Sequence, residues 1–258
     1  MKTKIILVAL LLVLQSLNSA GAQNANSNYL RTITPTTAAA DASLLNVNQA
    51  IRSIQYFDGL GRPLQQVQQQ ASPNKADLVA HQEYDTHGRA SNAWLPVVAA
   101  GNNGALVAQT QIAGKALATY NNDPKAYARS VYENSPLHRV KEQYGPGQDW
   151  HNNGKSVKTR FLTNNTQYFC MPYVTADGRE YVDHGRGQYI LAYNNGTLFV
   201  TEYQDEDGNV SYEFKDKLGM LVMSRQIVAG VNQDTHYVYD SYGNLKAVFP
   251  PCWWTTCR

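Results

Sequence analysis

The acidic residues of this chain recur at a fixed distance from a glycine. Carboxylates repeated at such a spacing could form an array that binds a metal ion or a sugar. Turn formation explains both the residue types and the spacing better, because Asp accepts backbone N–H groups within a turn and Gly suits its left-handed position. We therefore predict structural turn residues, and no metal site, at Asp58 and Gly61, Asp85 and Gly88, Asp205 and Gly208, Asp216 and Gly219, and Asp240 and Gly243.

Two other groupings contain residue types that can do chemistry. The acidic run 205–207, followed by Gly208 and Asn209, shares features with a calcium loop but lacks the spaced ligands and final Glu of an EF-hand. Ser135 and His138 could belong to a catalytic triad, but no Gly-x-Ser-x-Gly or His-x-x-x-His motif accompanies them. The six histidines are dispersed among polar and turn residues. The sequence predicts no catalytic residue, no cofactor and no enzyme activity.

Tryptophan offers a weaker hint of binding. Trp94 and Trp150, with Trp253 and Trp254 near the C-terminus, could stack against sugar rings. Packing in the core or along a sheet edge explains them as well. Trp94 and Trp150 are therefore only weak candidates for a binding site.

The repeated turns require strands between them. Regularly spaced turns joined by short apolar runs predict a mainly β fold, an antiparallel meander of hairpins. The excess of 17 Tyr over 6 Phe suits half-buried strand positions. We expect strands at 29–33, 79–84, 155–163, 221–228 and 245–249, and a hairpin across 131–144 with an Asn-Ser-Pro turn.

A helical insertion is expected near residues 105–128, where the sequence is rich in alanine and poor in β-branched residues. Asp123 followed by Pro124 has the sequence of a helix N-cap and first helical position, which predicts a short helical turn through Ala128.

The N-terminus has the features of a secretory signal peptide. Lysines precede the apolar run 5–14, and Ala20-Gly21-Ala22 forms a small-x-small cleavage site before Gln23. The apolar run is shorter than the roughly 20 residues of a membrane-spanning helix. The expected location is periplasmic, cell-surface or extracellular. A net charge of +2 with 16% charged residues gives no basis for nucleic-acid binding.

The C-terminal residues 252–258 depart from the repeat pattern. Read one base forward, this segment becomes an ordinary apolar continuation, so we hypothesise that a frameshift has truncated a longer protein. The alternative is a natural tail, closed by a bridge between Cys252 and Cys257. Cys170 stands alone, and the disulfide status of the other two is left open.

Several motifs resemble one protein family. Tyr-Asp-x-x-Gly followed by Arg or Asn is similar to the YD repeat of Rhs proteins, as in 237–245 followed by Pro250-Pro251. The segment 56–63 and the run 132–140, followed by Gly145-Pro146-Gly147 and Trp150, resemble the N-terminal region of secreted Bacteroidetes Rhs proteins, a domain of unknown function. The resemblance implies that the hairpins form part of a hollow β shell, which in polymorphic toxins encloses a C-terminal toxin domain.

The expected organisation is a signal peptide (1–22), a polar leader (23–50), an Rhs-associated domain (51–170), YD-repeat hairpins (171–251) and the atypical tail (252–258). The expected function is that of a non-catalytic segment starting such a shell, in a truncated fragment. Its partners would be the rest of the shell, or other chains that pair with open strand edges. The alternative is a secreted cell-surface module that binds glycan or protein. No membrane span is expected.

Overall fold

The computed structural model describes residues 27–46, 48–176, 179–182 and 192–251. The chain divides into two compact units. Unit 1 comprises Met1–Arg129 and Gly145–His151, and unit 2 comprises Ser130–Tyr144 and Asn152–Arg258. The expected signal peptide and the tail 252–258 lie outside the described residues, as does the Asp-Gly turn that the sequence indicates at 177–178.

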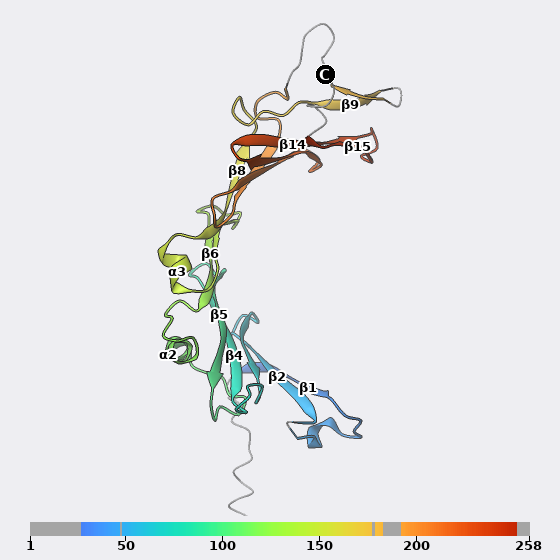
Figure 1. The fold of residues 1–258 in the computed structure, drawn as a ribbon. Helices are drawn as coiled ribbons and strands as arrows, with labels where there is room; N and C mark the ends of the chain where they lie inside the picture. Colours follow the sequence, from blue (N-terminus) through green and yellow to red (C-terminus); the bar gives the residue numbers. More distant parts are fainter. Residues whose placement is uncertain (1–26, 47, 177–178, 183–191, 252–258) are drawn as a thin grey trace, which may run out of the picture. The chain divides into compact units, whose positions relative to one another are not determined.

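The fold is mainly β, as the turn spacing predicted. Thirteen strands form one antiparallel sheet in the order β1-β2-β3-β4-β5-β6-β7-β8-β11-β12-β13-β14-β15, while β9 and β10 form a separate hairpin (Figure 1). Strand order follows chain order, which defines a meander. The strands are β1 (Asn28–Pro35), β2 (Ala50–Phe57), β3 (Pro63–Gln68), β4 (Asp77–Tyr84), β5 (Ala90–Ala99), β6 (Tyr127–Tyr132), β7 (Val140–Tyr144), β8 (Ser156–Thr163), β9 (Tyr173–Ala176), β10 (Arg179–Val182), β11 (Phe199–Gln204), β12 (Val210–Lys215), β13 (Leu221–Val228), β14 (Val231–Tyr239) and β15 (Leu245–Phe249).

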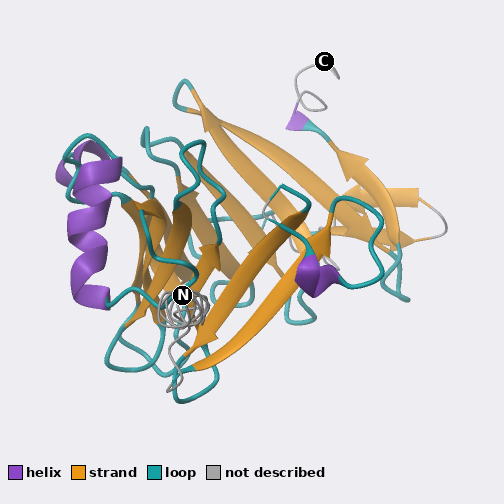
Figure 2. Cartoon of the chain, turned by 90° about the horizontal axis from the view of Figure 1, so that it is seen from below, coloured by secondary structure: helices purple, strands orange, loops and turns teal. Residues whose placement is uncertain are grey.

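In unit 1, alternate residues of β2 to β5 face a buried core. Ile54, Val67 and Val79 are fully buried, as period-two alternation requires for a sheet with one covered face. Helix α2 (Gln109–Thr119) covers this face through Ile112 and Ala116 (Figure 2). The short helices η2 (Ala42–Leu44) and α3 (Gln148–Asn152) complete the helical elements among the described residues.

Unit 2 has its own core. Val200, Phe214 and Met223 lie on the covered face of β11 to β13, where Cys170 and Leu198 pack against them. The covering residues come from the long connection between β8 and β11. Each unit thus pairs a sheet with a segment that closes one face of it.

Helix α2 lies within the expected insertion, but the expected helical turn after Asp123 is wrong. The Asp123 carboxylate accepts the Lys125 N–H at 2.7 Å in a turn, and the chain then enters β6 at Tyr127. Ala126 is buried and Tyr127 pairs with Trp94 on β5, so sheet pairing overrides the local helical signal. The strand expected near Tyr29 is present as β1 and pairs along its whole length with β2. None of the helices described here is long and apolar enough to cross a membrane.

Candidate functional site

The Asp-x-x-Gly turns are closed by hydrogen bonds of their own. The Asp58 Oδ1 atom accepts the backbone N–H groups of Leu60 and Arg62, each at 2.9 Å. The Asp58 N–H donates to the Arg62 carbonyl at 2.9 Å, and the Gly61 N–H donates to the Asp58 carbonyl at 3.1 Å. Gly61 adopts φ +78°, the left-handed conformation that the sequence predicted for it.

The same arrangement recurs at the other four turns. In each, Asp Oδ1 accepts the N–H groups of the second and fourth residues after it. Hydrogen bonds from the fourth residue hold the carboxyl pKa below its usual value at Asp58, Asp85, Asp205 and Asp240. These carboxylates are occupied by their own turns, which accounts for their spacing.

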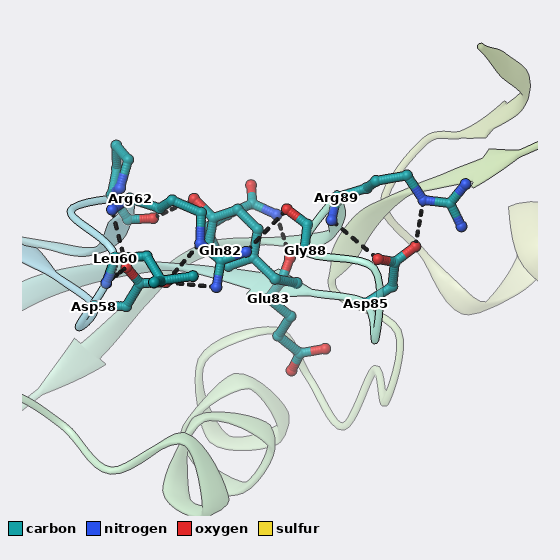
Figure 3. Close-up of polar contacts among 10 residues, drawn as sticks. Asp58, Leu60, Arg62, Gln82, Glu83, Asp85, Gly88 and Arg89 are labelled. Atoms are coloured by element: carbon teal, nitrogen blue, oxygen red, sulfur yellow. Dashed lines mark hydrogen bonds and ion pairs between the residues drawn. The ribbon is translucent and has the colours of Figure 1, made fainter. Parts of the chain in front are cut away.

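Arg62 connects the first turn to the second (Figure 3). Its Nε donates to Asp58 Oδ2 at 2.7 Å, and its Nη1 donates to the Gly88 carbonyl at 2.9 Å. The guanidinium lies 4.2 Å from the centre of the Tyr84 ring, and the Tyr84 hydroxyl donates to the Pro63 carbonyl at 2.7 Å. This arrangement, called here the arginine bridge, ties two successive hairpins together.

Arg89 occupies the equivalent position in the Asp85 turn and donates from Nε to Asp85 Oδ2 at 2.7 Å, whereas the turns at Asp205, Asp216 and Asp240 place shorter or apolar side chains there. The Asn209 and Asn244 side chains each donate to their own Asp, at 2.8 and 3.1 Å, and Met220 occupies this position in the Asp216 turn. No group of three or more His, Cys, Asp and Glu side chains with the geometry of a metal site occurs among the described residues.

In the Asn-Ser-Pro turn, an ion pair takes the role that the Asp carboxylate has in the other turns. Arg139 Nε and Nη2 donate to the Glu133 carboxylate at 2.8 and 2.9 Å, and the Ser135 hydroxyl donates to it at 2.6 Å. These bonds, from Arg139 first, lower the Glu133 pKa to about 2. The Ser135 hydroxyl therefore stabilises a turn, in which the backbone N–H of exposed His138 donates to the Ser135 carbonyl at 3.3 Å.

The two weak tryptophan candidates differ in burial. Trp94 is 9% exposed, donates its indole N–H to Glu83 at 2.8 Å and packs 4.7 Å from the Tyr127 ring. It is a core residue that could not stack on a sugar. Trp150, in α3, is 46% exposed.

Two buried histidines were not anticipated from the sequence. His81 on β4 and His236 on β14 are each 4% exposed. His81 Nε2 and His236 Nδ1 are buried and have no hydrogen-bond partner within the described structure. Burial lowers the pKa of both imidazoles. The signal was available in the alternation of β14, where His236 shares its face with buried Val238.

The fold resembles that of solved structures. The chain is similar to the crystal structure of TcdB2-TccC3-TEV over 96% of its own length and 11% of that chain, at 14% identity and a TM-score of 0.51. A crystal structure of TcdB2-TccC3 matches 80% of this chain and 9% of that one, at 14% identity and a TM-score of 0.44. This chain thus spans about a tenth of the length of either.

No curated protein matches the chain. A sequence family, in contrast, matches residues 31–163, more than half of the chain. The chain belongs to this family, which is described as a domain of unknown function, DUF6443.

Proposed function

We propose that the chain is a non-catalytic structural segment that begins the β shell of an exported Rhs/YD-repeat protein. The observation that carries the proposal is the row of self-closed turns joined by the arginine bridge from Arg62 to Gly88. Such turns reverse the chain without help from other elements, so hairpins can follow one another in a continuous strip. The fold resemblance to TcdB2-TccC3-TEV and the YD-type motifs support the same reading.

The outer strands supply the surfaces for assembly. Within the described residues, β1 pairs only with β2, and β15 pairs only with β14. Leu30 on β1 is 61% exposed and Val248 on β15 is 46% exposed. Strand edges with exposed apolar residues tend to pair with other strands. The expected partners are further hairpins of the same shell or other chains.

The sequence further supports two proposals, one on export and one on truncation. The N-terminal 22 residues direct export, and the tail 252–258 marks a frameshift that cut the chain from a longer toxin-like parent. Resequencing the locus beyond the Pro251 codon tests the second proposal. Further YD repeats in the shifted frame are expected, and their absence would contradict truncation.

The edge proposal is tested on purified residues 23–258 by multi-angle light scattering over a range of concentrations. Concentration-dependent association is expected, and Leu30→Lys and Val248→Lys should each weaken it, because charge on an edge opposes strand pairing. Phe199→Lys is the matched control, since Phe199 is 60% exposed but lies on β11, between β8 and β12. A monodisperse monomer at all concentrations would contradict the proposal.

The exposure of Trp150 favours one alternative, a cell-surface module that binds glycan or protein. A glycan-array or cell-wall signal that is lost in Trp150→Ala would support this alternative. Equal signal from the variant would remove it.

A further inference from the structure

A short stretch of the β8–β11 connection lies across the covered face of unit 2. Residues 168–173 are called here the strap. Cys170 of the strap is fully buried, and the Phe169 ring lies 5.2 Å from the Arg225 guanidinium of β13. At the end of the strap, the Tyr173 ring packs 4.7 Å from the imidazole of His236 on β14.

His236 is enclosed by apolar neighbours. It pairs with Met223 on β13 and Phe249 on β15, and Tyr173 packs against its ring. Its Nδ1 atom is buried and has no hydrogen-bond partner among the described atoms. A neutral imidazole tolerates this position, but a second ring proton would require an acceptor that the site does not offer.

The charged groups around His236 do not supply that acceptor. Asp234, on the same strand, forms a two-bond ion pair with Arg225, with both N–O distances 2.7 Å. Arg225 also donates to the Phe169 carbonyl at 3.3 Å. The other titratable groups nearby are Cys170 and Tyr173 of the strap, and β15 presents the uncharged Phe249. Arg225 repels a charged imidazole, while Asp234 attracts it but is already bound.

We propose that the strap is an acid-operated cover, which protonation of His236 releases from β14. Lifting Tyr173 would let water reach the imidazolium and relieve its desolvation. A cavity of about 440 Å³, lined by Cys170, Met223 and His236 among others, already lies beside the strap. The structure therefore places a proton-sensitive group directly beneath the element that would move.

The direction of the pH effect follows from linkage. Burial is the largest cause that lowers the pKa of His236. The positive charge of Arg225 lowers this pKa further, and the negative charge of Asp234 partly opposes the shift. A released strap would return the imidazole to its ordinary pKa of about 6.5. The open fraction should therefore rise as the pH falls below about 6.5, by at most about tenfold per pH unit, and level off below the lowered pKa.

Cys170 reports the opening directly, because the strap must lift before a reagent reaches its thiol. The experiment uses the full chain carrying Cys252→Ser and Cys257→Ser, and a dithiodipyridine reagent that labels thiols in acid. Labelling rates are measured between about pH 7.5 and about pH 5 and divided by the rate of free cysteine at each pH. The corrected rate should rise several-fold to tenfold across this range. A corrected rate that does not change with pH would overturn the proposal.

His236→Asn removes the titrating group, and its corrected rate should stay level with pH. The matched control is His138→Asn, an exposed position in the same unit with φ +53°, which Asn tolerates; it should behave like the parent. A pH-dependent rise that survives in His236→Asn would overturn the proposal. If this variant fails to fold, an NMR titration of His236 in the parent decides. Titration at or above the ordinary pKa with the strap still docked would also overturn it.

Discussion

Single residues determine whether each turn closes and whether it reaches its neighbour. Asp58 satisfies its own turn, whereas Arg62 reaches the Gly88 carbonyl of the next one. Gly61 and Gly88 share φ +78°, but a Cβ at Gly88 would lie 2.7 Å from Arg62 Nη1, and a Cβ at Gly61 would meet nothing within 4 Å. Substituting each glycine in turn therefore distinguishes the effect of backbone strain from the effect of losing the arginine bridge.

We expect Gly61→Ala to destabilise the protein by about 1 kcal/mol through its left-handed backbone. Gly88→Ala should cost about 1 kcal/mol more, because it also displaces the Arg62 hydrogen bond. Urea unfolding of both variants measures the difference. In an Arg62→Ala background the excess should vanish, and an excess that persists would contradict the role of the bridge.

The turn carboxylates should make stability depend on acid. The pKa of Asp85 is lowered by the Arg89 N–H, so its contribution is present above the ordinary pKa of about 4 and is lost as the pH falls through the lowered value. Asp85→Asn should unfold at a lower urea concentration than the parent near neutral pH. On acidification, the variant should lose less further stability than the parent does. Glu206→Gln, at a half-buried carboxylate that none of the described turn hydrogen bonds uses, is the control and should follow the parent. Parallel pH profiles for Asp85→Asn and the parent would refute the assignment.

At the scale of elements, buried side chains attach the covering segments to the sheet. In unit 1, the side chain of Gln65 on β3 forms two bonds with the backbone of Val107: Oε1 accepts its N–H at 2.8 Å and Nε2 donates to its carbonyl at 3.0 Å. The Tyr56 hydroxyl donates to the Gly104 carbonyl at 2.7 Å. These side-chain bonds therefore attach the backbone of the segment before α2 to β2 and β3.

Gln65→Leu should lower the free energy of unfolding by about 2–4 kcal/mol, because it leaves two buried backbone groups of Val107 without partners. Amide hydrogen exchange should accelerate at Val107 and through α2. Gln66→Leu, on the adjacent exposed position, serves as the control and should change neither. Unchanged exchange at Val107 in Gln65→Leu would contradict the attachment.

The sequence reveals the turns but not the segments that cover the two sheets, and the reason is physical. An Asp-x-x-Gly turn closes within five residues, so its chemistry is written locally, as at Asp58 and Gly61. The strap depends on contacts such as that between Phe169 and Arg225, which are 56 residues apart. The limits of α2 were equally hidden, because its N-cap, Ala108, makes no side-chain cap hydrogen bond. Trp94 could not be placed without Glu83 and Tyr127, which only the sheet register brings beside it.

At the scale of the whole molecule, the two units have separate cores. Ile112 of α2 belongs to the cluster of unit 1, and Met223 of β13 belongs to that of unit 2. Both side chains are fully buried. Damage to one core should therefore weaken its own unit first.

We expect Ile112→Ala and Met223→Ala each to destabilise the mutated unit by about 2–5 kcal/mol. Hydrogen exchange followed by peptide mass spectrometry should show faster exchange in β2 to β5 for Ile112→Ala, and in β11 to β14 for Met223→Ala. Exchange in the other unit should stay near that of the parent. Uniform acceleration over both units in either variant would show a single cooperative body instead.

The closed turns have a consequence for how such chains can change over generations. Because the Asp240 turn satisfies itself within five residues, inserting or deleting a whole hairpin would leave the hydrogen bonds of every other such turn intact. Arg62 adds a bond to the following hairpin, so a deletion there would carry a penalty that a deletion at Asn209 or Asn244 would not. Genes of this kind should tolerate copy-number variation in steps of one hairpin, and tolerate it best where Asn stands in place of Arg.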